Sequence, residues 1–204
     1  MLHVCGVSDI CPVPGRAPAR SVWPTSAAAN RGGARVNGYV EHHPKDILGA
    51  GATAPDFALH RSPEETIRLS TLRGKPVVLV FYPADWSAVC GDELNVFNEA
   101  ESLLAAADAE VLGISVDGVW CHRAFVADRG FRFALLSDFE PKGEVSARYG
   151  AYDFHAGTSR RALFVIDESG LIAWSHLSPV DVNPGVDGVL DALDALKSPA
   201  VSRD

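Results

Sequence analysis

The feature that most constrains this chain is the uninterrupted apolar run VVLVFY at residues 77–82, which Pro83 ends. A run of this length without polar alternation is typical of a central strand that is covered on both faces. A second run, EVLGISV at residues 110–116, predicts another buried strand. Strands buried on both faces need helices on each side of the sheet, so these runs predict a layered α/β fold.

The patterns around these runs predict an alternating order of strands and helices. Polar and apolar residues alternate in the arms of an N-terminal hairpin, and apolar residues recur at helical spacing in longer segments. We predict hairpin arms at 56–59 and 66–69, helices at 89–107, 121–129 and 143–149, a short strand at 133–136, hairpin arms at 162–166 and 171–176, and a closing helix at 186–196. A ββα unit after βαβ units indicates a thioredoxin-like fold, with a central mixed β-sheet flanked by helices and an N-terminal hairpin.

Two of the predicted helices have apolar faces that can be assigned by residue. An apolar face of this kind is expected to pack against the sheet. The predicted faces are Leu94, Phe97, Leu103 and Leu104 in the helix at 89–107, and Val186, Val189, Leu190, Leu193 and Leu196 in the closing helix.

The two ends of the chain differ from its middle. Residues 1–45 are rich in Pro, Arg, Gly and Ala and show no sustained periodicity, so they cannot bury enough apolar surface to offset their ordering entropy. The only methionine is Met1. We therefore expect residues 1–45 to be a disordered extension, or a segment upstream of a true translation start at a valine such as Val36 or Val40. The folded domain is expected at 46–197, followed by a short tail at 198–204.

Composition excludes several classes of function. The net charge of −8 argues against a nucleic-acid partner, and no segment approaches the run of about 18 apolar residues that a membrane-spanning helix needs. Four cysteines in no regular spacing favour a cytoplasmic protein with one or two reactive thiols over a disulfide framework. The sequence contains no zinc-ligand set and no phosphate-binding glycine motif, so we expect no metal and no cofactor. Cys5 and Cys11 lie in the N-terminal extension and are expected to take no part in the chemistry.

Cys90 is the cysteine whose position favours reactivity. It follows Pro83 by seven residues, at the predicted first turn of a helix. The thiolate is the form that attacks electrophiles, and the free amide groups at a helix N-terminus stabilise an anion. The alternative is a buried cysteine that fills apolar space, which is the common state of this residue. Position alone leaves both interpretations open.

The residues around Cys90 resemble a known active-site motif. The spacing Pro83-x3-Ser87-x2-Cys90 is similar to the Pro-x3-Thr/Ser-x2-Cys motif of peroxiredoxins of the AhpC/TSA superfamily. The resemblance covers nearly all of residues 46–197 and is strongest to the AhpE-like branch. It implies a thiol-dependent peroxidase that reduces hydrogen peroxide and organic hydroperoxides, with Cys90 as the peroxidatic cysteine that becomes a sulfenic acid. It also implies that Pro83 shields the thiolate and that the Ser87 hydroxyl contacts the peroxide.

Two adjacent arginines, Arg160 and Arg161, precede the apolar segment ALFVID. The segment resembles the family's Arg-x-x-Phe-Val-Ile-Asp stretch, which assigns to Arg161 the role of holding the thiolate and the leaving oxygen, and leaves Arg160 as a solvated charge. Glu93 occupies a position where related proteins often carry a glutamate that orients the arginine. The alternative for Glu93 is an ordinary acid in the first turn of a helix.

The sulfenic acid formed at Cys90 must be reduced before it is oxidised further. The position five residues after Cys90, which one subgroup of the family uses for a resolving cysteine, is Asn95. Cys121, at the start of the next predicted helix, remains as a candidate because other relatives resolve from this helix; the alternative is an inert helix-start residue. A disulfide would require local unwinding, since it needs Cα atoms within about 7 Å of each other.

The resemblance also implies partners. These are a peroxide substrate, a thiol reductant (thioredoxin, or a low-molecular-weight thiol with a glutaredoxin-like protein) and a second copy of the chain in a homodimer. Two other functions stay open: a peroxide-sensing redox regulator, which reacts once and does not turn over, and a thiol–disulfide oxidoreductase on the same fold. The latter proteins usually carry a CxxC motif, and the segment CGDE at residues 90–93 is not one.

Overall fold

Seven strands pair in the order β2-β1-β5-β4-β3-β8-β9. The computed structural model describes residues 46–197, so the predictions for residues 1–45 and 198–204 lie outside the described residues. Neighbours β3, β4 and β5 run parallel, whereas β8 is antiparallel to β3 and β1 is antiparallel to β5. The strands are β1 (Ala58–His60), β2 (Thr66–Arg68), β3 (Val77–Phe81), β4 (Glu110–Ser115), β5 (Ala134–Ser137), β8 (Ala162–Ile166) and β9 (Ile172–Leu177).

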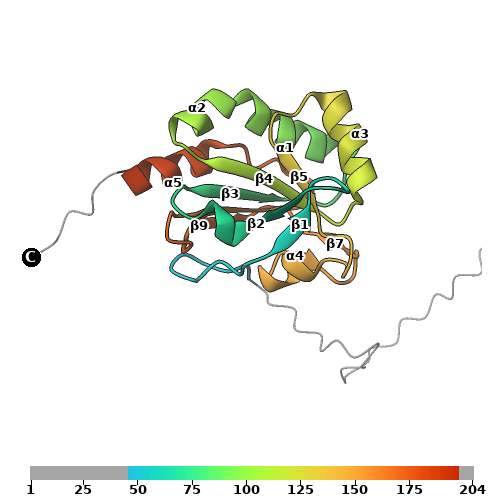
Figure 1. The fold of residues 1–204 in the computed structure, drawn as a ribbon, viewed down its shortest axis with the longest axis horizontal. Coiled ribbons are helices and arrows are strands. Elements are labelled where there is room, and N and C mark those ends of the chain that lie inside the picture. The colour runs from blue at the N-terminus through green and yellow to red at the C-terminus, as the bar shows by residue number, and fades with distance from the viewer. Residues whose placement is uncertain (1–45, 198–204) are drawn as a thin grey trace, which may run out of the picture. The chain divides into compact units, whose positions relative to one another are not determined.

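Helices cover both faces of this sheet, with α1, α2 and α3 on one side and α4 on the other (Figure 1). Their bounds are α1 (Ala88–Glu99), α2 (Glu101–Ala106), α3 (Val119–Arg129), α4 (Glu144–Arg148) and α5 (Asp187–Lys197). Three short elements were not predicted: the 3-10 helix η1 (Leu69–Leu72) and the two-residue strands β6 (Tyr152–Asp153) and β7 (Thr158–Ser159). Elements this short carry too few residues for a periodic pattern to reveal them.

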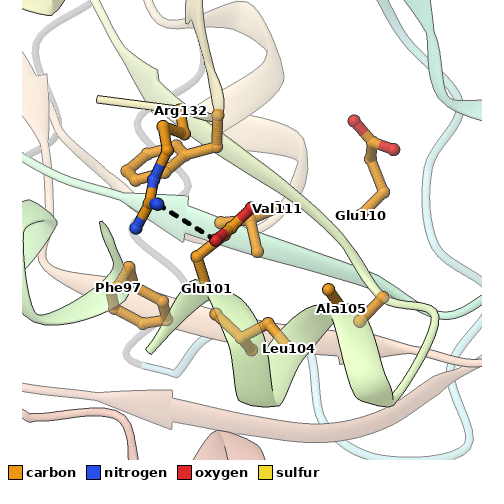
Figure 2. A pocket seen from close by; sticks show the side chains of 9 residues that line it. Phe97, Glu101, Leu104, Ala105, Glu110, Val111 and Arg132 are labelled. Atoms are coloured by element: carbon orange, nitrogen blue, oxygen red, sulfur yellow. Dashed lines mark ion pairs between the residues drawn. The ribbon is translucent and has the colours of Figure 1, made fainter. Parts of the chain in front are cut away.

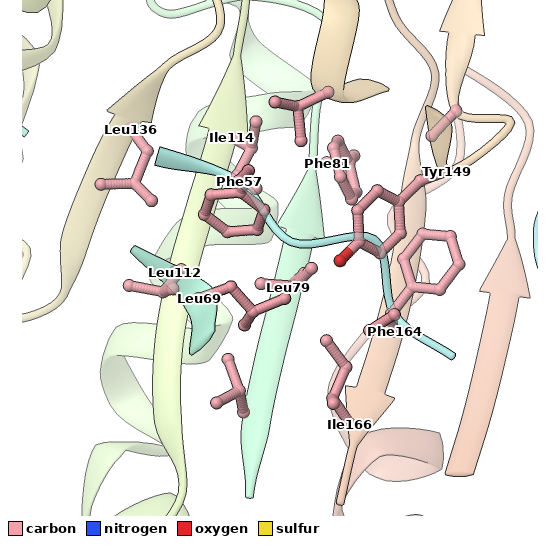
Figure 3. Close-up of a cluster of buried hydrophobic side chains, with 14 of the residues drawn as sticks. Phe57, Leu69, Leu79, Phe81, Leu112, Ile114, Leu136, Tyr149, Phe164 and Ile166 are labelled. Atoms are coloured by element: carbon pink, nitrogen blue, oxygen red, sulfur yellow. The ribbon is translucent and has the colours of Figure 1, made fainter. Parts of the chain in front are cut away.

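The central strand β3 divides the core into two clusters. All five of its residues are buried. Val78 and Val80 pack in the cluster that includes residues of α1, α2, α3 and α5. Leu79 and Phe81 point into the opposite cluster, where Tyr149 lies beside Phe81 and the phenylalanine of β8 (Figure 3). The apolar run at 77–82 is therefore a strand covered on both faces, as predicted.

The mixed sheet between helices confirms the thioredoxin-like α/β fold, with the β1–β2 hairpin at the N-terminal side of the described chain. None of the helices within residues 46–197 combines the length and apolar character needed to cross a bilayer.

The helix predicted at 89–107 is wrong in one respect, because the chain forms two helices there. Ala100 separates them, and its ψ of 3° departs from the helical value near −42°. Leu104, seven residues after the buried Phe97, is 2% exposed. Leu103, which was predicted on the same apolar face, is 57% exposed, because it lies on the other side of the helix from Phe97.

The closing helix α5 keeps most of its predicted apolar face. Val189 and Leu193 are buried against the sheet, and Val186 is buried just before the helix begins. Leu196 is partly exposed because it lies in the last turn, at the end of the described chain.

Adjacent leucines of α2 allow a matched test of which side of α2 is buried. Leu104→Ala is expected to lower the free energy of unfolding by about 2–4 kcal/mol, since it removes buried methyl groups and leaves a cavity. Leu103→Ala makes the same chemical change on the exposed side and should cost less than about 0.5 kcal/mol. Denaturant unfolding of both variants measures the difference. Equal losses would contradict the placement of Leu103 on the exposed side of α2.

Candidate active site

The loop after β3 delivers Cys90 to the first turn of α1. Ser87 has the extended conformation of a helix N-cap, with φ −68° and ψ 136°, and α1 begins at Ala88. Cys90 is the third residue of the helix and is fully buried. The sequence prediction of a cysteine in the first helical turn is confirmed. Its sulfur therefore lies near amide groups that can stabilise an anion.

Pairing of β3 with β8 brings Arg161 to the same place. The strands are antiparallel with Phe81 opposite Ala162, so the residue before β8 lies where the chain leaves β3. Nη2 of Arg161 lies 3.4 Å from Sγ of Cys90. Arg161 is only 1% exposed, so this guanidinium faces the sulfur away from bulk water. A cation in this position stabilises a thiolate.

Two acceptors hold the buried guanidinium in place. Nη1 of Arg161 donates to Oε2 of Glu93 in a buried ion pair. Glu93 follows Cys90 by three residues in α1, so both side chains project from one face of the helix. The carbonyl of Val180, in the segment after β9, accepts from Nε at 3.2 Å and from Nη2 at 2.8 Å. Its half-buried neighbour Arg160 instead donates to the carbonyl of Gly150 at 3.2 Å.

Burial changes the acidity of Glu93. Removal of the carboxyl group from water raises its pKa to about 7, although the charge of Arg161 and the hydrogen bond from it act in the opposite direction. Its second oxygen, Oε1, is buried and has no hydrogen-bond partner among the described residues. The carboxylate form is therefore costly, and the contact with Arg161 is what offsets this cost.

Ser87 and Pro83, the other two residues of the motif, lie in the loop before α1, and both are half-buried. The Ser87 hydroxyl makes no capping hydrogen bond to α1. Between them lies Trp86, a half-exposed residue with a φ of +62°. A non-glycine residue in this left-handed region costs roughly 1–2 kcal/mol, so neighbouring contacts must hold the loop.

Asp85 makes contacts that hold this loop. It was not identified as a functional residue from the sequence. Its carboxylate accepts from Tyr82 and His122, and its backbone N–H donates to Asp117. The sequence contained only weak signals for these partners, since His122 merely follows Cys121 and Asp85 is one of the variable positions in the motif. The carbonyl of Val180 had no sequence signal, because any residue offers one.

Cys121 lies at the start of α3, half-buried and unpaired. Burial raises the pKa of its thiol, and the carboxylates of Asp85 and Asp117 raise it further. Ligand atoms of these three residues lie within 4.8 Å of one another. Both carboxylate oxygens of Asp85 and Oδ2 of Asp117 already accept hydrogen bonds from the protein.

A surface hollow elsewhere on the molecule shares none of its lining residues with the Cys90 site. It has a volume of about 160 Å³ and lies between α2 and the start of β4 (Figure 2). An ion pair between Arg132 and Glu101, 3.3 Å apart, crosses it.

The fold and the buried cysteine–arginine pair define a class of protein, the cysteine-dependent oxidoreductases with a thioredoxin-like fold. The sequence pattern of the AhpC/TSA family matches residues 50–175. Alkyl hydroperoxide reductase E of Mycobacterium tuberculosis is 38% identical over 132 residues, which cover 64% of this chain and 86% of the relative. Peroxiredoxin tpx1 of Schizosaccharomyces pombe is 36% identical over 160 residues, covering 74% and 82%. The solved structure of Mycobacterium tuberculosis AhpC has a TM-score of 0.66 and 27% identity, covering 75% and 100%.

The chain therefore belongs to the AhpC/TSA family and is a peroxiredoxin, as the sequence predicts. Membership makes it a thiol-dependent peroxidase.

The raised pKa of Glu93 predicts a pH dependence of stability. In the unfolded chain the carboxyl group has its ordinary pKa of 4.5, whereas burial raises its pKa to about 7 in the folded protein. Between these values the folded state binds more protons, so the free energy of unfolding decreases as the pH rises through this window. Glu93→Gln should remove this decrease, because an amide does not titrate.

Denaturant unfolding midpoints, measured between about pH 4.5 and about pH 8, test this assignment. The control is Asp92→Asn, which removes an exposed acid from the adjacent position and should keep the wild-type profile. Superimposable profiles for wild type and Glu93→Gln would contradict the assignment.

Proposed function

We propose that Cys90 is the peroxidatic cysteine of this peroxidase and that Arg161 activates it. The observation that carries the proposal is the distance of 3.4 Å between Nη2 of Arg161 and Sγ of Cys90, in a site where both side chains are buried. A guanidinium at this distance favours the thiolate, which is the nucleophile. A cysteine that only filled apolar space would gain nothing from a buried cation beside it.

In the proposed reaction the thiolate attacks the terminal oxygen of a hydroperoxide. The sulfur–oxygen bond forms as the oxygen–oxygen bond breaks, and the electron pair of the broken bond stays with the leaving oxygen. That oxygen departs as water or an alcohol after it takes up a proton, and Cys90 becomes a sulfenic acid. Donors placed where the charge develops lower the barrier, and Arg161 is such a donor.

The neighbouring residues have supporting roles in this proposal. Ser87 offers a hydroxyl that is free of helix capping and can bind the peroxide, and Pro83 limits access of water to the sulfur. Glu93 is a positioning residue, because it contacts Arg161 and fixes the direction of the guanidinium. Serine lacks the methyl group that restricts a threonine rotamer, so binding through Ser87 is less preorganised than binding through threonine.

We propose Cys121 as the resolving cysteine. Its thiol lies against Asp85, which belongs to the same loop as Ser87. Attack of the Cys121 thiolate on the sulfenic sulfur would form the sulfur–sulfur bond and break the sulfur–oxygen bond, and the hydroxide that leaves would take up a proton from solvent to become water. In the closed loop, burial and nearby carboxylates keep this thiol protonated, so we expect attack only after the loop unwinds and removes both effects.

The remaining partners follow from the chemistry and from family membership. The disulfide needs two electrons, which we propose come from thioredoxin or from a low-molecular-weight thiol with a glutaredoxin-like protein. If Cys121 is not used, the same external thiols would attack Cys90 directly. We also propose substrates that include hydrogen peroxide and organic hydroperoxides, a homodimer and a cytoplasmic location.

The roles of the two cysteines are testable by rapid mixing. Stopped-flow tryptophan fluorescence of the reduced protein with hydrogen peroxide should give a fast phase that Cys90→Ser abolishes, because the nucleophile is gone. Mass spectrometry should find a Cys90–Cys121 disulfide in the wild type and sulfenic acid at Cys90 in Cys121→Ser.

Each outcome has a distinct meaning. Sulfenic acid without disulfide in the wild type would show a one-cysteine enzyme with external reduction. A single oxidation without turnover in the presence of a thiol reductant would favour a sensor. A wild type that reacts no faster than free cysteine would refute the role of Cys90.

The role of Arg161 is tested by a pair of adjacent substitutions. Arg161→Lys keeps the positive charge but loses the planar guanidinium that contacts sulfur, Glu93 and Val180 together, so the rate of Cys90 oxidation should fall about 100-fold. Arg160→Lys, at the neighbouring position outside the site, should react like wild type. Equal effects of the two substitutions would contradict the assignment.

A further inference from the structure

The loop between β3 and α1 is held by buried polar groups that the reaction above does not use. Oδ1 of Asp85 accepts from the Tyr82 hydroxyl at 2.8 Å, and Oδ2 accepts from Nδ1 of His122 at 2.9 Å. The backbone N–H of Asp85 donates to Oδ2 of Asp117 at 2.9 Å. The side chains of Asp85 and His122 are 0% and 1% exposed. One loop residue is thus anchored to the end of β3, to α3 and to the segment after β4.

The anchored residue directly precedes the strained part of the loop. Trp86 has a φ of +62°, and its ring packs on Phe125 of α3 with the centroids 5.0 Å apart. Ser87 follows it and leads into the helix that carries Cys90. A strained residue keeps its conformation only where surrounding contacts determine it. The conformation that presents Ser87 and buries Cys90 therefore depends on the contacts of Asp85 and Trp86 with α3.

The shortest polar contact of the His122 ring is the one from Nδ1 to Asp85, at 2.9 Å, whereas the Tyr82 hydroxyl lies 3.5 Å from the same nitrogen. Because a carboxylate only accepts, Nδ1 of His122 carries the proton of their hydrogen bond. The other ring nitrogen, Nε2, is buried and has no partner within the described part of the chain. A buried polar atom without a partner destabilises the fold, and an apolar residue of similar size would avoid this cost. A leucine at position 122 would fill similar space but would lack the hydrogen bond to Asp85 in the loop.

We propose that His122 is a positioning residue of the peroxidase, which acts through Asp85 to hold the β3–α1 loop closed around Cys90. The inference rests on the proposed role of Cys90. In the closed loop Cys90 is buried beside Arg161 and reacts with small peroxides. Loss of the His122 contact shifts the loop toward an open form, in which the sulfur leaves the arginine and becomes accessible to larger reagents.

The test compares two reagents of different size on three variants. In His122→Leu the rate of Cys90 oxidation by hydrogen peroxide should fall about tenfold. The rate of Cys90 alkylation by a bulky maleimide, located by peptide mass spectrometry, should rise about tenfold. In His122→Asn an amide N–H replaces Nδ1–H at nearly the same position, so both rates should return toward wild type. His155→Leu, the same change at an exposed histidine, should leave both rates unchanged.

Opposite changes in the two rates distinguish positioning from general damage. A variant that had merely lost its fold would not regain both rates with asparagine, and thermal unfolding of each variant establishes that it is folded at the assay temperature. If the wild type reacts with peroxide but His122→Leu does not raise the alkylation rate, the positioning role is overturned. Failure of the proposed function would look different, because the wild type itself would then not be oxidised at Cys90.

Discussion

The site depends on a guanidinium that is buried. Taking a charge such as that of Arg161 out of water costs several kcal/mol unless other groups compensate for the loss. The chain supplies the carboxylate of Glu93, the carbonyl of Val180 and the sulfur of Cys90. These groups come from α1 and from the segment after β9, so the charge fixes how both approach the start of β8. The groups that compensate the buried charge of Arg161 therefore include the sulfur of Cys90, which they bring next to the guanidinium.

The sheet determines where this charge lies. Antiparallel pairing of β3 with β8 places Phe81 opposite Ala162, and the chain leaves β3 at the point where Arg161 precedes β8. A register shift by one residue would turn Arg161 toward the opposite face of the sheet. That face packs against α4 and the apolar cluster around Tyr149, on the opposite side of the sheet from Cys90. The buried apolar strands therefore have a second role besides forming the core, because their register places Arg161 on the same side of the sheet as Cys90.

Much of this arrangement was predictable from the sequence. The apolar run at 77–82 predicted the central strand. The resemblance to family motifs led to Cys90, Arg161 and Glu93, whose side chains the structure brings together. The contacts that were missed involve groups that no sequence pattern reveals. The contact at Val180 uses a backbone carbonyl, which every residue has. The hydrogen bond from His122 to Asp85 joins positions 37 residues apart, between which no periodic pattern runs. The break at Ala100 was hidden because alanine favours helices.

The two acceptors of Nη2 explain how the arginine can stay in place through the proposed cycle. Before reaction, Nη2 faces both the sulfur of Cys90 and the carbonyl of Val180. Oxidation to a sulfenic acid removes the negative charge from sulfur, so that contact weakens while the one to Val180 does not change. Nη1 still donates to Glu93. A guanidinium held by two groups that take no part in the redox chemistry remains preorganised for the next thiolate, without the reorganisation that a mobile cation would require.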